Sequence, residues 1–167
     1  MKKIGLFYKT GSAKTAQVAG KIEKQLGESV EIISVEHAWS KDFEKFSNFI
    51  IGSSTWFDGE LPTYWDELIP ELKSINLKNK KVAIFGLGDQ KNYPDNFVDG
   101  IGILAEAVES AGAKIVGLTS TEGYHFDRSR ALRNGQLLGL AIDIENQSDK
   151  TEKRIKDWCN QLKKEFE

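Results

Sequence analysis

Four short, continuous runs of apolar residues limit what this chain can fold into. They stand at residues 4–8, 49–52, 82–86 and 115–118, and a fifth run at 30–35 alternates apolar and polar residues. A strand reads as continuously apolar when a parallel sheet is covered on both of its faces. The runs therefore predict a parallel sheet with helices on each side.

Helical spacing fills the intervals between these runs. Apolar residues recur every three or four positions in four segments: Val18, Ile22 and Leu26; Leu61, Trp65, Leu68 and Leu72; Phe97, Ile101, Leu104 and Val108; and Ile155, Trp158 and Leu162. Strands that alternate with helices predict an α/β fold with right-handed crossovers. The chain has 167 residues, so we expect a single domain over residues 1–167.

Ligands in such folds bind beyond the carboxyl ends of the strands, which here means the loops at 9–15, 53–60 and 87–97. The first of these loops contains Thr10, Gly11, Ser12, Ala13, Lys14 and Thr15. Unpaired N–H groups in the first turn of the following helix attract anions, and the hydroxyl groups add donors. We interpret the loop as a cradle for a phosphate group. Taken alone, however, the loop is explained somewhat better by an ordinary helix cap.

Three familiar motifs do not fit this loop. The nucleoside-triphosphate motif G-x-x-x-x-G-K-[ST] fails because Ala13 precedes Lys14 and Tyr8 stands where the first glycine belongs. No dinucleotide-binding G-x-G-x-x-G follows the first run. A phospho-acceptor receiver domain would need acidic residues at the end of the first strand, where Phe7 and Tyr8 stand.

The other two loops each carry an aromatic residue. The segment "GSSTWFDGELP" at 52–62 contains Trp56, and "GLGDQKNYPDNF" at 86–97 contains Tyr93. Two aromatic side chains at the same edge of the sheet as a phosphate cradle can enclose a flat ring. A flat heterocycle that carries a single phosphate suggests flavin mononucleotide (FMN).

At these residues the chain resembles the long-chain flavodoxins, and the resemblance covers essentially its whole length. The segments that carry it are "KKIGLFY", "IIGSSTWFDGELP", "FGLGDQKNYPDNF", "EGYHF" and "LGLAID", in that order. The resemblance implies a flavodoxin-like three-layer sandwich with a five-stranded parallel sheet of order 2-1-3-4-5. It also identifies the segment 119–139 as the long-chain insertion, which interrupts the fifth strand until it resumes near residues 140–142.

The resemblance assigns roles around a non-covalently bound FMN. Residues 10–15 would bind the phosphate, and Trp56 and Tyr93 would stack on the two faces of the isoalloxazine ring. The turn at 57–59 would lie beside flavin N5. The remaining residues that we expect at the site are Ser54 and Thr55 before Trp56, Phe57, Asp58 and Gly59 in the turn, Gly88, Asp89 and Asn96 near the pyrimidine edge, and Asp143 near the ribityl chain.

The function that the resemblance implies is that of a low-potential one-electron carrier, not an enzyme. The flavin would cycle between semiquinone and hydroquinone, and the protein would replace ferredoxin. No titratable cluster suggests acid–base or nucleophilic catalysis, and the single cysteine, Cys159, excludes a metal site built from several cysteines. We predict no catalytic and no metal-binding residues. The alternative is an FMN-dependent NAD(P)H:quinone oxidoreductase, which would need an open nicotinamide site over the ring.

Charge is unevenly distributed along the chain. The net charge is −2, yet the segments 57–72 and 87–99 hold eight acidic residues and one lysine, a local charge of −7. This disfavours nucleic acid and favours a basic protein partner. The resemblance implies that the partners are redox proteins, such as ferredoxin–NADP reductase or another ferredoxin- or flavodoxin-dependent oxidoreductase. No apolar run is long enough to span a membrane. We expect a monomer in the cytoplasm.

Overall fold

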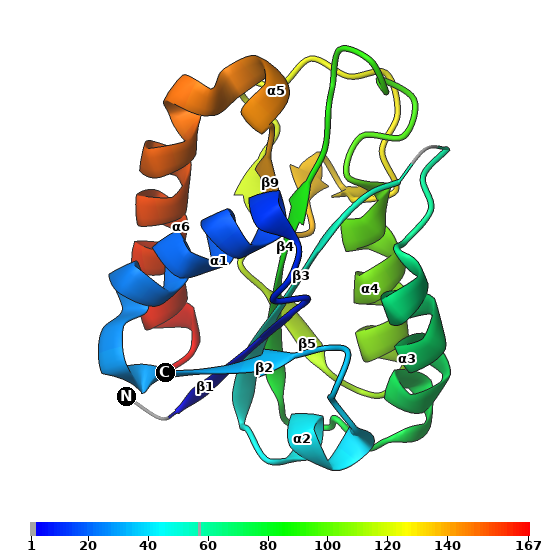
Figure 1. The fold of residues 1–167 in the computed structure, drawn as a ribbon, viewed down its shortest axis with the longest axis vertical. Helices are drawn as coiled ribbons and strands as arrows, with labels where there is room; N and C mark the ends of the chain where they lie inside the picture. The colour runs from blue at the N-terminus through cyan, green and yellow to red at the C-terminus, as the bar shows by residue number, and fades with distance from the viewer. Residues whose placement is uncertain (1–2, 57) are drawn as a thin grey trace.

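The computed structural model describes residues 3–56 and 58–167. Its centre is a sheet of order β2-β1-β3-β4-β5 (Figure 1). The strands are β1 (Ile4–Tyr8), β2 (Val30–Ser34), β3 (Asn48–Ser54), β4 (Lys81–Leu87) and β5 (Lys114–Val116). Every neighbouring pair runs parallel, which confirms the predicted α/β fold and the order 2-1-3-4-5.

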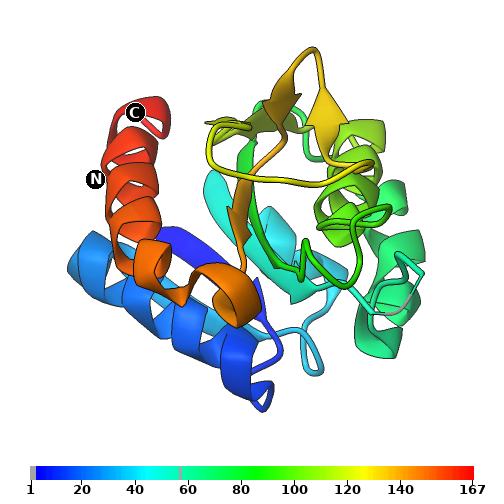
Figure 2. The same cartoon turned by 90° about the horizontal axis from the view of Figure 1, so that it is seen from above.

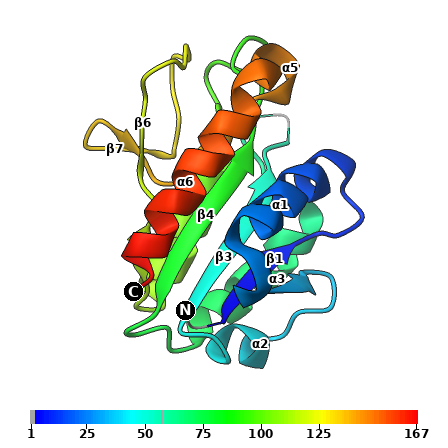
Figure 3. The same cartoon turned by 90° about the vertical axis from the view of Figure 1, so that its left-hand side faces the viewer.

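The fifth position in the sheet is shared by two short strands. β5 pairs with the first residues of β4, and β9 (Leu140–Ile142) pairs with its last residues, from Phe85 to Leu87. Between β5 and β9 the chain forms a small antiparallel sheet of β6 (Thr119–Ser120), β7 (Leu132–Arg133) and β8 (Gln136–Leu137). Figure 3 shows this segment standing away from the main sheet. The predicted interruption of the fifth strand by the insertion 119–139 is therefore confirmed.

Helices cover both faces of the sheet and complete three layers. α1 (Ala13–Leu26) and α6 (Thr151–Glu165) lie on one face, and α3 (Thr63–Ser74) and α4 (Asp99–Ser110) lie on the other (Figure 2). The short helices are α2 (Ser40–Glu44) and α5 (Ile144–Gln147), and single 3₁₀ turns form at Gly27–Ser29 and Ser148–Lys150. Within the described residues, no helix has both the length and the apolar character that crossing a bilayer takes.

Successive side chains of each central strand enter opposite layers. In β3, Phe49 and Ile51 pack with the layer that contains α3 and α4, whereas Ile50 packs with the layer of α1 and α6. All three side chains are fully buried, which is why the strand reads as a continuous apolar run. The edge strand β2 is partly buried at every position, so its burial does not follow the alternation of its sequence.

The insertion is fixed to α4 by close backbone contact. Gly102 lies so near the insertion that a Cβ at this position would stand 2.2 Å from the carbonyl oxygen of Arg130. The buried carboxylate of Asp99 accepts a hydrogen bond from the backbone N–H of Arg130 at 2.8 Å. Further along α4, Glu109 accepts two hydrogen bonds from the guanidinium of Arg133, at 2.8 and 2.9 Å. These contacts hold the insertion against the helix that follows the loop at 88–97.

Candidate functional site

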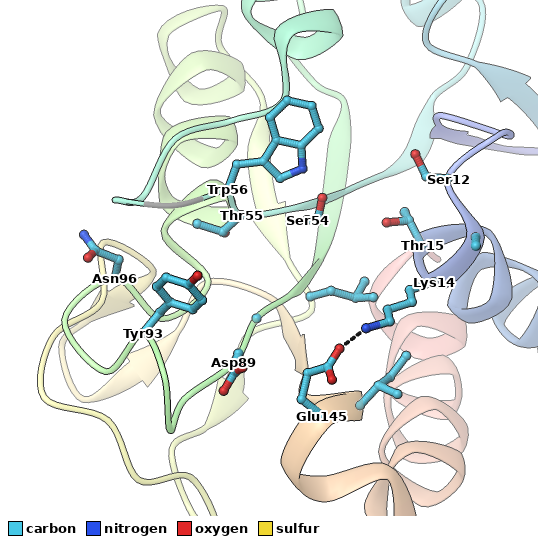
Figure 4. Close-up of a pocket in the computed structure, with 14 residues that line it drawn as sticks. Ser12, Lys14, Thr15, Ser54, Thr55, Trp56, Asp89, Tyr93, Asn96 and Glu145 are labelled. Carbon is cyan, nitrogen blue, oxygen red and sulfur yellow. Dashed lines mark hydrogen bonds and ion pairs between the residues drawn. The ribbon is translucent and has the colours of Figure 1, made fainter.

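A cavity of about 460 Å³ lies at the carboxyl ends of the strands, where the sequence predicts a ligand. The loops that surround it are joined by backbone hydrogen bonds from Thr55 to Leu87 (3.2 Å) and from Gly88 to Ile142 (3.0 Å). The residues that line it are Ser12, Ala13, Lys14, Thr15, Ser54, Thr55, Trp56, Leu87, Gly88, Asp89, Tyr93, Asn96, Ile144 and Glu145 (Figure 4). The cavity therefore collects side chains from loops that are far apart in the sequence.

One end of the cavity is the beginning of α1. Ser12 is the residue before the helix, and the first helical hydrogen bond joins the N–H of Ala16 to the carbonyl oxygen of Ser12 at 2.7 Å. The backbone N–H groups of residues 13–15 come before this first helical hydrogen bond. They have no carbonyl partner among the described residues. Thr15 is only 2% exposed and still lines the cavity. This end therefore offers several donors and suits an anion.

Among the described residues, two aromatic side chains belong to the lining of the cavity. Tyr93 lies across it from α1, and Trp56 closes another side (Figure 4). Their side chains remain 45% and 43% exposed, although most large apolar residues of this chain are buried. The backbone of Trp56 is held by reciprocal hydrogen bonds with Glu60, at 2.7 and 2.8 Å. Exposed rings on well-held loops are suited to stacking against a flat ligand.

The turn beside Trp56 is tied to the loop that carries Tyr93. The side-chain amide of Asn96 donates to the carbonyl oxygen of Asp58 and to the carboxylate of Asp99, both at 3.2 Å. Gly59 has a φ of 88°, and a Cβ there would lie 2.4 Å from the Asp99 carboxylate. Only glycine fits this close approach, so the two loops are held in a fixed relation.

Asp143 was expected to reach the ribityl chain, but it is not among the residues that line the cavity. Its carboxylate is fully buried and caps α5 by accepting a hydrogen bond from the N–H of Asn146 at 3.0 Å. It also accepts hydrogen bonds from the backbone and side-chain nitrogens of Gln90, at 3.1 and 2.8 Å. These hydrogen bonds engage both carboxylate oxygens of Asp143. The side chain therefore holds the loop at 88–93 in place without lining the cavity.

Asp89 lines the cavity and keeps its negative charge. Burial raises the pKa of its carboxyl group, but hydrogen bonds from Asn92 and Asn146 stabilise the charged form more, and the pKa falls below the ordinary value of 3.8. Asn146 also bonds Asp143, at 2.9 Å, which links the two carboxylates through one amide.

The structure gathers most of the predicted site residues around the cavity. Eleven line it: Ser12, Ala13, Lys14, Thr15, Ser54, Thr55, Trp56, Gly88, Asp89, Tyr93 and Asn96. Thr10, Gly11, Asp58, Gly59 and Asp143 do not line it, and Phe57 lies outside the described residues. Sequence reasoning missed Leu87, Ile144 and Glu145. Applying the carboxyl-end rule to the strand that resumes at 140–142 would have found Ile144 and Glu145.

FMN fits these features. N–H groups without a carbonyl partner in the described part of the chain, together with the buried Thr15, provide one anion-binding end. The rings of Trp56 and Tyr93 provide apolar surface for a flat group. Trp39, the other exposed tryptophan, does not line the cavity. The lining thus offers one place for a phosphate and one for a ring system, which is the pattern of a mononucleotide.

Comparison with known proteins gives the same result. A family model described as Flavodoxin matches residues 6–158. Flavodoxins of Nostoc sp. and Synechococcus elongatus are 49% and 46% identical, and the matches cover 99% of this chain and 98% and 99% of those proteins. A solved Fusobacterium nucleatum flavodoxin bound to flavin mononucleotide superposes with a TM-score of 0.95 at 38% identity and covers 100% of both chains. The chain therefore belongs to the flavodoxin family of FMN-binding electron carriers.

Proposed function

We propose that this chain is a low-potential carrier of single electrons that holds one FMN in the cavity and takes the place of ferredoxin. The observation that carries the proposal is the cavity itself. At one end, N–H groups at the start of α1 have no carbonyl partner among the described residues, and Trp56 and Tyr93 belong to its lining. Membership of the flavodoxin family makes the chain an electron-transfer protein rather than an enzyme. The alternative of a quinone oxidoreductase is therefore not retained.

Different residues would bind the phosphate and the ring of FMN. The start of α1, with Ser12 and Thr15, would hold the phosphate, and Trp56 and Tyr93 would exclude water from the two faces of the ring. FMN supplies the redox chemistry, and the protein sets its potential. The turn at 58–59 would lie beside flavin N5. The side-chain amide of Asn96 holds this turn by donating a hydrogen bond to the carbonyl oxygen of Asp58 at 3.2 Å.

Acidic residues around the cavity support a low potential. Of the eight acids counted in the sequence, Asp99 is buried and used internally, whereas Asp58, Glu60 and Asp95 are exposed. One carboxylate about 10 Å from added negative charge costs roughly 1.7 kcal/mol at an effective dielectric constant near 20, before salt screening. A cost of about 1.4 kcal/mol corresponds to about 59 mV for one electron. A few such residues lower the potential by an amount on the order of 100 mV.

The proposed partners are redox proteins with a basic docking face, of which a ferredoxin–NADP⁺ reductase is an example. We expect NADPH to reduce the protein in stopped-flow mixing only when such a reductase is present. We also expect the rate to fall as the ionic strength rises from low to moderate values, because the exposed acids steer a basic partner. Reduction by NADPH alone would contradict a carrier role, and a rate that does not change with salt would contradict electrostatic steering.

A further inference from the structure

Glu145, which sequence reasoning missed, forms an ion pair inside the cavity. It lies in the first turn of α5, directly beyond β9, and its carboxylate pairs with the ammonium group of Lys14 in the first turn of α1 (Figure 4). Both residues line the cavity, and both side chains are about half exposed. The pair thus joins the start of α1 to the start of α5 at the anion-binding end, and both of its side chains remain accessible to solvent.

Lys14 is the one cationic side chain among the described residues that line the cavity. The acidic lining residues are Asp89 and Glu145, and Asp89 accepts its hydrogen bonds from asparagine side chains and backbone. Glu145 is therefore the acidic lining residue whose carboxylate pairs with the ammonium group of Lys14. A phosphate monoester carries a charge of about −1.5 to −2 at pH 7, so it would attract Lys14 and repel Glu145.

A second ion pair on the same helix provides a comparison for the Lys14–Glu145 pair. Lys21, seven residues further along α1, pairs with Glu152 of α6, and neither residue lines this cavity. Beneath both pairs, α1 packs on α6 and the sheet through buried apolar residues such as Val18 and Ile22. An exposed ion pair adds little to such packing. The position of the Lys14–Glu145 pair, at the cavity, sets it apart from the Lys21–Glu152 pair.

We propose that Glu145 competes with the cofactor phosphate for Lys14, so that Lys14 leaves Glu145 when the phosphate is held at α1. Glu145 then weakens cofactor binding, because it holds the ammonium group of Lys14 that would otherwise pair with the phosphate. This inference rests on the proposed function, because it takes the beginning of α1 as the phosphate end of the cavity.

The test compares three ligands on the apoprotein by isothermal titration: FMN, inorganic phosphate, and riboflavin, which lacks the phosphate. Glu145→Gln should lower the Kd for FMN and for inorganic phosphate by about two- to fivefold and leave riboflavin binding unchanged. Glu152→Gln is the matched control, because it breaks the equivalent pair away from the cavity, and it should leave all three affinities unchanged. Thermal unfolding of each apoprotein checks that the fold is intact.

A double-mutant cycle tests whether the effect passes through Lys14. In a Lys14→Gln background, the gain from Glu145→Gln should fall to less than half, because no ammonium group is left to release. An undiminished gain there, or FMN binding that is unchanged or weaker in Glu145→Gln alone, would overturn the exchange. Failure of the wild-type apoprotein to bind FMN would instead overturn the proposed function, so the two ideas fail separately.

Discussion

Replacing Tyr93 with alanine should weaken FMN binding by about 1–3 kcal/mol, or roughly 5- to 150-fold, the range for a base stacked on an aromatic side chain. The ring lines the cavity and is 45% exposed, so its removal takes away stacking surface and leaves little void in the core. The backbone N–H of Tyr93 bonds to the carbonyl oxygen of Asp89 at 2.9 Å, and the substitution keeps this bond. Trp56→Ala should weaken binding as well.

Titration of the apoproteins with FMN, followed by quenching of flavin fluorescence, measures these affinities. Trp39→Ala is the control, because Trp39 is an exposed tryptophan that does not line the cavity, and it should bind FMN like the wild type. If Tyr93→Ala and Trp56→Ala both titrate like the wild type, the two aromatics do not enclose the cofactor.

Replacing Trp158 with alanine should lower the free energy of unfolding of the apoprotein by about 3–5 kcal/mol, the usual cost of truncating a buried aromatic residue. The side chain is 1% exposed in the layer between α6 and the sheet. Its indole N–H donates to the carbonyl oxygen of Gly117 at 2.8 Å, next to the point where the chain leaves β5 for the insertion. Truncation leaves both a cavity and a buried carbonyl group without its donor.

Urea unfolding of the apoprotein measures this difference. Trp158→Phe should fall between the wild type and Trp158→Ala, because it keeps most of the apolar volume while losing the N–H donor and part of the ring system. Trp39→Ala, at a position that is 62% exposed, should change the free energy of unfolding by less than about 0.5 kcal/mol. A loss below about 1 kcal/mol for Trp158→Ala would show that this layer of the core does not depend on the ring.

The sheet could be predicted from the sequence because burial on both faces leaves a continuous apolar pattern. The strand predicted at 4–8 has the observed bounds of β1, and the run at 115–118 marks β5 within one or two residues. The short helices α2 and α5 were missed. They have five and four residues, which is too short for a helical period to be distinguished from chance.

The cavity could be predicted in outline because strand ends converge in a parallel sheet. Individual side chains depend on tertiary contacts that no spacing encodes. Asp143 was expected at the cofactor, but Gln90 from a distant loop and the N–H of Asn146 occupy its carboxylate. Asp99 was counted among the eight acids that favour a basic partner, but it is buried against the insertion. The pairing of Glu145 with Lys14 could not be predicted, because the two residues lie 131 positions apart in the sequence.

Acid extraction of the purified protein, followed by chromatography of the released cofactor, tests the central claim most directly. We expect one FMN per chain, because the described residues that line the cavity provide one anion-binding end and two rings for a flat group. A protein purified without cofactor should take up one FMN when it is reconstituted. Recovery of FAD, or of no flavin after reconstitution with FMN, would contradict the assignment of this cavity to FMN.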